Sequence, residues 1–219
     1  MIKDRPHCLI VGVGAGTGLD CVRRFVDGGY KASIIARHEG RLASWTDEIS
    51  NTAPYPSDIM DIEKYRDTLL QIRAEHGVPK VIVCYASLAT FANFSELDPA
   101  NFERNFCSNT TGLLMTAQAF GPDMVAAGSG AIVVTGNSGA CRGTACFVGF
   151  APTKASQRIL GESLARELGP QGVQSRSRQR YAVSTCLREG IGLHICDGTK
   201  QIRKIFIYRR KLAKVQIRA

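Results

Sequence analysis

The feature that most constrains the fold is a regular alternation between short apolar runs and longer segments with helical periodicity. The runs have the length of strands, and the segments between them repeat apolar residues every three or four positions. The predicted strands are Cys8–Val13, Ala32–Ala36, Pro54–Ser57, Val81–Ala86 and Ala131–Thr135. The predicted helices are Leu19–Asp27, Glu39–Ser50, Asp61–Glu75, Pro99–Ala127 and Ala151–Leu168. This order predicts an α/β fold with a doubly wound, parallel sheet.

Charge divides the chain into two parts of different character. Residues 1–174 hold 16 Lys and Arg against 17 Asp and Glu, whereas residues 175–219 hold 12 against 2. A chain of 219 residues suits one domain. We therefore predict a folded body over residues 1–173 and an atypical basic segment over residues 174–219. The near-neutral body argues against a nucleic-acid partner, although the basic segment offers contact with a polyanion.

The same sequence argues against membrane, secreted and metal-binding classes. No apolar run approaches the ~18–20 residues of a membrane-spanning helix, and the first residues lack the pattern of a secretory signal. Eight cysteines are scattered without a CxxC pair, which argues against a zinc site or a redox dithiol. We expect reduced thiols, a cytoplasmic location, no membrane span and no bound metal.

Four alternating glycines lie between the first predicted strand and the first predicted helix, at Gly12, Gly14, Gly16 and Gly18. Because glycine has no Cβ, such a loop lets backbone N–H groups approach a pyrophosphate at the start of a helix. The strict GxGxxG pattern fails because Thr17 occupies its last glycine position, but the pattern GxxxGxG is met. The loop therefore predicts a dinucleotide site, with a tight turn that binds no ligand as the alternative.

The end of the second predicted strand bears on the choice of dinucleotide. An acidic side chain at this point binds the adenosine ribose hydroxyls and favours NAD. The chain instead has Ala36 followed by Arg37, and an arginine can bind a 2′-phosphate. The sequence predicts NADP, with NAD as a second choice, and the alternative is that Arg37 is a solvated loop residue.

Taken together, motifs over about residues 7–173 resemble the short-chain dehydrogenase/reductase family, whose fold is Rossmann-like. The glycine loop is similar to the cofactor fingerprint of that family. Asp58 and Ile59 resemble the Asp-Val pair that caps the adenine ring. Cys84-Tyr85-Ala86-Ser87 stands where the family has Asn-Asn-Ala-Gly, so that Ala86 alone is retained.

The resemblance also implies catalytic residues. Asn109 matches the asparagine that holds a water in the proton relay, and Lys154 matches the lysine of Tyr-x-x-x-Lys that binds the nicotinamide ribose. The substrate-orienting serine falls on Ser138, or one residue earlier on Asn137. The catalytic tyrosine is missing, because its position is taken by Phe150. Phenylalanine has no ionisable group and cannot act as a general acid.

A substitute acid is therefore needed if hydride transfer occurs. The candidates are Ser138, a water held by Lys154 and relayed through Asn109, and Tyr85. We predict an NADP-preferring oxidoreductase that acts on a small carbonyl or alcohol. The alternative is a catalytically weak or inactive protein that binds dinucleotide as a sensor or scaffold.

Beyond Val173 the resemblance fades, because the Pro-Gly turn of the family is absent. The C-terminal strands are expected to be incomplete or replaced, and Gly190–Gly198 is a candidate for a displaced sixth strand. The basic segment is either a functional tail or a replaced C-terminus that arose from splicing or a change of reading frame. Because the family often assembles through its long helices, a homodimer or homotetramer is expected if the fold is complete.

Overall fold

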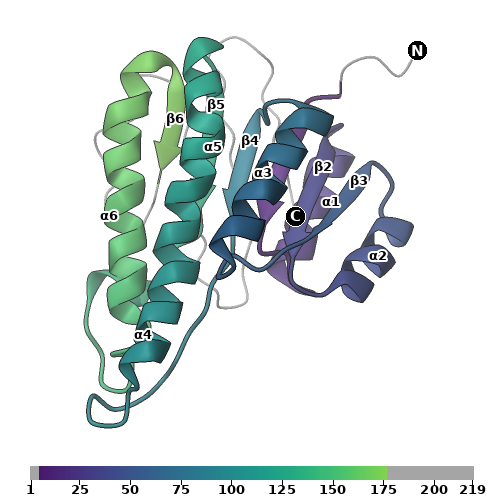
Figure 1. The fold of residues 1–219 in the computed structure, drawn as a ribbon. Helices are drawn as coiled ribbons and strands as arrows, with labels where there is room; N and C mark the ends of the chain where they lie inside the picture. The colour runs from purple at the N-terminus through teal and green to yellow at the C-terminus, as the bar shows by residue number, and fades with distance from the viewer. Residues whose placement is uncertain (1–4, 177–219) are drawn as a thin grey trace.

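The structure, a computed structural model, describes residues 5–176 and forms a parallel sheet covered by helices on both faces (Figure 1). Its strands are β1 (His7–Val11), β2 (Lys31–Ala36), β3 (Thr52–Pro56), β4 (Val81–Cys84), β5 (Gly130–Val134) and β6 (Val173–Arg176). They lie in the order β3-β2-β1-β4-β5-β6, and every neighbouring pair is parallel. This is the strand order of the Rossmann fold, and it confirms the predicted fold class.

Helices connect these strands, and most of them match the predicted segments. They are α1 (Thr17–Asp27), α2 (Glu39–Glu48), α3 (Ile62–His76), α4 (Pro99–Phe106), α5 (Gly112–Ala126) and α6 (Ala151–Leu168). Short helical turns are η1 (Cys107–Thr111), η2 (Ser138–Cys141) and η3 (Gly169–Gln171). The single long helix predicted over Pro99–Ala127 is therefore α4, a π-helical turn at η1, and α5.

Alternate residues of the strands build two cores, one on each face of the sheet. In β1, the side chains of Leu9 and Val11 pack with α3, α5 and α6, where Phe120 is fully buried. The side chain of Ile10 packs with α1 and α2, where Leu42 is fully buried. Figure 1 shows α3, α5 and α6 side by side over one face. Burial on both faces explains why the strands are continuous apolar runs.

The chain reverses its direction of travel across the sheet between β1 and β4. From β1 it moves outward to β2 and β3, and then returns to the other side of β1 as β4. The backbone amides of Gly12 and Val13 donate to the carbonyl of Ile35, and those of Tyr85 and Ala86 donate to the carbonyl of Val11. These bonds hold the three loops that follow β1, β2 and β4 together, where such sheets bind ligands.

The last described strand crosses the predicted boundary of the body. Strand β6 pairs with β5 from Gly130–Val173 to Val133–Arg176, so the sheet continues three residues past Val173. The predicted strand at Gly190–Gly198 and most of the basic segment lie outside the described residues. The origin of this segment stays a prediction.

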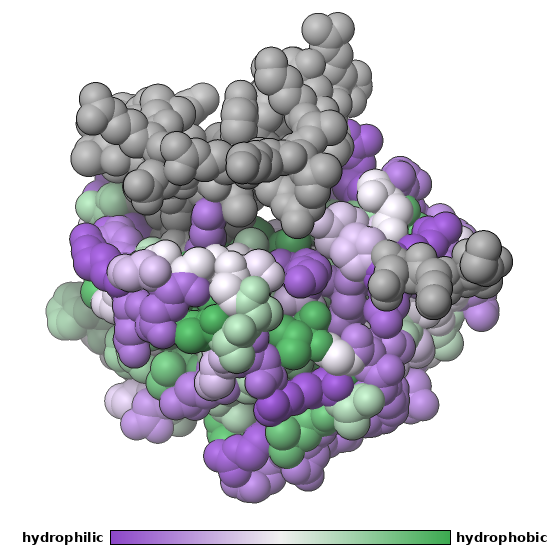
Figure 2. Space-filling model, turned by 90° about the horizontal axis from the view of Figure 1, so that it is seen from above, coloured by the Kyte–Doolittle hydropathy of each residue, from purple (hydrophilic) through white to green (hydrophobic). Residues whose placement is uncertain are grey.

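Figure 2 shows the molecule from above, relative to the view of Figure 1. On the part of this face that the described residues form, hydrophilic residues separate the hydrophobic patches. None of the helices within residues 5–176 is both long and apolar enough to cross a membrane. The six described cysteines are free thiols, of which Cys141 and Cys146 are exposed.

Candidate active site

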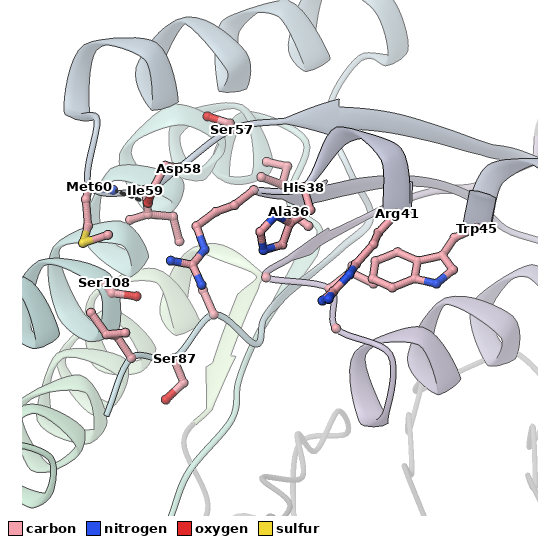
Figure 3. Close-up of a pocket in the computed structure, with 17 residues that line it drawn as sticks. Ala36, His38, Arg41, Trp45, Ser57, Asp58, Ile59, Met60, Ser87 and Ser108 are labelled. Carbon is pink, nitrogen blue, oxygen red and sulfur yellow. Dashed lines mark hydrogen bonds between the residues drawn. The ribbon is translucent and has the colours of Figure 1, made fainter. Parts of the chain in front are cut away.

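A cleft of about 230 Å³ opens at the carboxyl ends of the strands. Its walls come from the loops that follow β1, β2, β3 and β4 and from the turn η1. Figure 3 shows Arg41 and Trp45 on one side of this cleft, and Ser87 and Ser108 on the other. The predicted residues that line it are Gly12, Gly14, Arg37, Asp58, Ile59 and Ala86. The structure thus brings residues from four separate loops into one cavity.

The glycines of the first loop have two distinct roles. Gly12 has φ +86°, and a Cβ added there would lie 2.3 Å from the Cα of Ala86. A Cβ on Gly18 would lie 3.0 Å from the Cα of Val13. By contrast, a Cβ on Gly14 or Gly16 would meet none of residues 5–176 within 4 Å. Gly12 and Gly18 therefore permit close packing, whereas Gly14 and Gly16 leave the space before α1 open.

The end of the cleft beyond β2 is basic. Arg37, His38 and Arg41 all line it and are exposed, and Trp45 adds an aromatic side chain. Within residues 5–176, neither arginine forms an ion pair with a carboxylate. Arg41 was not singled out from the sequence, although its place in the first turn of α2, directly after β2, was the available signal. Two guanidinium groups without an anionic partner suit a phosphate.

The opposite wall of the cleft comes from the segment after β3. Asp58 accepts a hydrogen bond from the amide of Met60 at 3.0 Å through Oδ1, which fixes the turn. The side chain of Ile59 is 7% exposed and packs against Gly112 at the start of α5. The buried hydroxyl of Ser57 also lines the cleft and has no hydrogen-bond partner among the described residues. An apolar wall beside polar groups suits a purine ring, as predicted for Asp58 and Ile59.

Lys154 lies in the first turns of α6 and is almost fully buried. Its Nζ donates to the backbone carbonyl of Thr135 at 2.8 Å and to the side-chain oxygen of Gln157. Burial disfavours the charged ammonium and lowers the pKa of Lys154 to about 8, while the nearby Cys84 thiol acts in the opposite direction. Gln157 is a partner of Lys154 that the sequence reasoning missed.

Phe150 occupies the position just before α6, one helical turn before Lys154, and its side chain forms no capping hydrogen bond. Its side chain is 7% exposed and contacts the ring of Phe91, with ring centroids 5.6 Å apart. An aromatic ring here has the bulk of the tyrosine that the family resemblance implies, but it offers no proton.

The side chain of Asn109 forms hydrogen bonds that connect two segments of the chain. Its amide donates to the carbonyl of Leu88 and to the hydroxyl of Thr153, and its oxygen accepts from the amide of Leu88, each at 2.8 Å. It lies in the π-helical turn η1, and such turns often occur at functional sites. Asn109 therefore ties the loop after β4 to the start of α6, and its role in a proton relay stays a prediction.

Ser138 and its neighbours differ in how they are engaged. The side chain of Asn137 accepts from the amide of Gly139 at 2.7 Å and caps η2, whereas Ser138 is exposed. A Cβ on Gly139 would lie 3.5 Å from the Cβ of Ala151, so η2 packs against the start of α6. Tyr85 packs with the core formed by α1 and α2. Of these side chains, that of Ser138 is the exposed one, and its role toward a substrate stays a prediction.

Comparison with known families identifies relatives of the whole described fold. A profile of the short chain dehydrogenase family matches residues 6–195. The galactitol 2-dehydrogenase (L-tagatose-forming) of Cereibacter sphaeroides is 29% identical over 176 residues, which cover 78% of this chain and 68% of that protein. The probable oxidoreductase EphD of Mycobacterium tuberculosis is 25% identical over 213 residues. That alignment covers 91% of this chain and 36% of EphD, so the chain spans about a third of that relative.

Solved structures share the fold. A short-chain dehydrogenase from Streptomyces avermitilis superposes with a TM-score of 0.75 at 24% identity, over 80% of this chain and 64% of that one. A gluconate 5-dehydrogenase from Burkholderia cenocepacia, in complex with NADP and tartrate, gives 0.71 at 22% identity, over 80% and 70%. A tyrosine-to-phenylalanine variant of ElxO with NADPH bound gives 0.73 at 21% identity, over 78% and 71%. With the family profile, the strand order and the glycine loop in agreement, the chain belongs to the short chain dehydrogenase family.

Proposed function

We propose that the protein is an NADP-preferring oxidoreductase that interconverts a small carbonyl compound and its alcohol. The observation that carries this proposal is the cleft itself, which joins an open glycine loop to a basic end whose arginines form no ion pair within residues 5–176. Gly14 and Gly16 would face the pyrophosphate, Asp58 and Ile59 the adenine, and Arg37 and Arg41 the 2′-phosphate. The residues present therefore fit an NADP molecule.

The names of two similar proteins support the same cofactor. A carbonyl reductase [NADPH] 2 from Sus scrofa is 24% identical over 186 residues, which cover 84% of this chain and 75% of that protein. The gluconate 5-dehydrogenase of the same fold was solved with NADP. These relatives differ in their named substrates, so the proposal for this chain extends only to the carbonyl or alcohol group.

When bound, NADPH supplies a hydride to a carbonyl carbon, and the carbonyl oxygen then takes up one proton. The chain must deliver that proton without a tyrosine, because Phe150 cannot ionise. The exposed hydroxyl of Ser138 can donate a hydrogen bond to the substrate oxygen. The ammonium of Lys154, whose pKa is lowered by burial to about 8, can supply a proton through water near neutral pH.

A second function is favoured by one observation, which is Phe150 itself. Without the phenol, a protein that binds dinucleotide and transfers hydride slowly or not at all would act as a sensor or scaffold. The tyrosine-to-phenylalanine variant of ElxO was solved with NADPH bound, so in that protein such a change permits binding. Retained binding without turnover is the signature of this alternative.

Turnover separates the two functions. The test is NADPH oxidation by the full chain with a panel of small aldehydes and ketones, in parallel with Ser138→Ala and Lys154→Met. We expect slow turnover in wild type and a roughly 10²-fold or larger loss in the variant that removes the proton donor. NADPH binding with no turnover in the whole panel would favour the sensor, and absence of NADPH binding would contradict both functions.

A further inference from the structure

Three phenylalanine rings meet at the candidate catalytic position, which Phe150 occupies. Phe91 contacts Phe147 with ring centroids 4.9 Å apart and Phe150 with centroids 5.6 Å apart, both in edge-on geometry. We call these three residues the aromatic wall. Although Phe91 touches both other rings, its side chain is 59% exposed, whereas Phe150 beneath it is 7% exposed. The wall therefore presents one aromatic ring outward and is supported by another from behind.

The wall is held in place by backbone contacts between two loops. Ala92 forms an isolated parallel bridge with Phe147, and its amide donates to the carbonyl of Cys146 at 3.0 Å. Asn105, fully buried in α4, donates to the carbonyl of Gly149 at 2.8 Å. These bonds fix the two loop segments that contain Phe91 and Phe147. The rings are therefore positioned before any ligand binds.

A close approach of backbone at Gly149 tightens the same junction. A Cβ on Gly149 would lie 2.6 Å from the carbonyl oxygen of Thr90, which precedes Phe91. The hydroxyl of Thr90 in turn donates to Asn105 at 3.4 Å. The absence of a side chain at Gly149 therefore lets the loop after β4 lie directly against the start of α6.

The aromatic wall is connected to the cleft on one side and to the buried lysine on the other. Leu88 lines the cleft and is tied by Asn109 to Thr153, which is next to Lys154. Three residues after Leu88, the same loop reaches Phe91, and Phe91 contacts Phe150, one helical turn before Lys154. A substrate whose carbonyl lies near Lys154 would thus have the exposed ring of Phe91 beside it.

We propose that the aromatic wall binds the ring of an aryl ketone or aryl aldehyde, so that the small carbonyl substrates of this protein carry an aromatic ring next to the carbonyl. This inference rests on the proposed oxidoreductase function. Aromatic rings attract one another in edge-on or offset geometry beyond their apolar area, because the edge of one ring is positive and the face of the other negative. A saturated ring of similar size lacks this interaction and would bind less tightly.

The test measures ligand binding and does not depend on turnover. The full-length protein, saturated with NADP⁺, which has no hydride to transfer to a ketone, is titrated by NMR with 2-acetylnaphthalene and with its decahydro analogue, which has a similar size but no aromatic ring. The variants are Phe91→Leu, which keeps an apolar side chain, and Phe94→Leu as the matched control. Phe94 lies on the same loop and is 86% exposed, but it is outside the wall.

We expect wild type to bind the naphthyl ketone roughly 3- to 10-fold more tightly than the saturated one. Phe91→Leu should abolish this preference, while Phe94→Leu should retain it, and neither should change the affinity for NADPH. Equal affinities in wild type, a preference that survives Phe91→Leu, or no ketone binding to the NADP⁺ complex would overturn the proposal. Failure to bind NADPH, measured beforehand, would instead contradict the proposed function.

If the exposed ring of Phe91 is covered by another part of the chain, neither ketone will reach it. Phe91→Leu would then lower the melting temperature of the ligand-free protein more than Phe94→Leu does, with no effect on ketone binding. That result would assign the wall to packing and would overturn its role in substrate recognition.

Discussion

At the scale of single residues, two glycines of one loop allow folding and binding to be separated. Gly12→Ala should destabilise the protein, because the new Cβ would overlap the backbone of Ala86 at a φ of +86°. Gly14→Ala should leave the melting temperature nearly unchanged, since its Cβ enters open space within the cleft. It should nevertheless weaken NADPH binding, because that space is where backbone would approach the pyrophosphate. Thermal unfolding and NADPH titration of both variants check this pair.

The reverse result would contradict the assignment of the loop. If Gly14→Ala bound NADPH as tightly as wild type, the open space before α1 would not be part of the cofactor site. If Gly12→Ala were as stable as wild type, the close approach to Ala86 would not constrain this position.

Restoring the missing phenol should not by itself restore the family's catalytic pair. In Phe150→Tyr, the ammonium of Lys154 would still donate to Thr135 and to Gln157. In Phe150→Tyr/Gln157→Leu, one donor would be freed for the phenolate, which lowers the pKa of the new tyrosine. Ultraviolet titration of each variant against its Phe150 parent measures this pKa directly, without any substrate.

The matched control for this experiment is Phe150→Tyr/Gln171→Leu. Gln171 also forms a side-chain hydrogen bond, to the carbonyl of Glu167, but it lies in η3 at the far end of α6. We expect the phenol pKa to fall only when Gln157 is removed. The same phenol pKa in all three variants would show that Gln157 does not compete for the ammonium.

The sequence predicted the location of some residues better than their partners. Arg37, Asp58 and Ile59 line one cleft as expected, because the ends of parallel strands meet at one edge of the sheet. Arg41 lines the cleft because of where α2 starts, and the bond between Lys154 and Gln157 depends on where α6 starts. No sequence motif marks either contact.

At the scale of elements, apolar runs located the first five strands to within a few residues. Strand β6 was missed, because Val173-Gln174-Ser175-Arg176 has no apolar run and is defined by backbone pairing with β5. The π-helical turn η1 was also missed within the long predicted helix. A helical period of apolar residues does not distinguish an α-helix from one that contains a single wider turn.

A buried histidine, His7, lies at the amino end of the sheet, where strands β1 and β2 meet helix α3. His7 is 4% exposed, its Nε2 lies 2.8 Å from the Ser33 hydroxyl, and its ring lies 5.4 Å from that of His76. Burial, with help from His76 and Lys31, lowers the pKa of His7 to about 4. The folded protein therefore binds a proton less readily than the unfolded chain between pH 6.5 and 4.

Stability should consequently fall as pH decreases from about 6.5 to about 4, by up to about 3 kcal/mol from this residue. His7→Gln keeps a polar group near Ser33 and should make denaturant unfolding less dependent on pH in this window. The exposed His38 provides the control, as His38→Gln removes an imidazole from the surface. An unchanged pH dependence in His7→Gln would show that this histidine is not buried in its neutral form.

At the scale of the whole molecule, the helices over one face leave large apolar side chains exposed. These include Phe106 on α4, Leu114 on α5 and Ile159 on α6, at 40%, 38% and 50% exposure. We expect a homodimer or homotetramer that uses α5 and α6. Leu114→Lys/Ile159→Lys should therefore reduce the mass measured by light scattering, and Leu70→Lys on α3 is the control. A monomeric wild type would contradict this expectation.

The measurement that tests the central claim most directly is the titration of the full-length protein with NADPH and with NADH. The account predicts that NADPH binds more tightly, because Arg37 and Arg41 line the cleft without anionic partners among the described residues. The double variant Arg37→Ala/Arg41→Ala should lose ~1.5–3 kcal/mol of NADPH binding, or more, and little of NADH binding. Equal affinities in wild type, or equal losses for both cofactors in the variant, would contradict it.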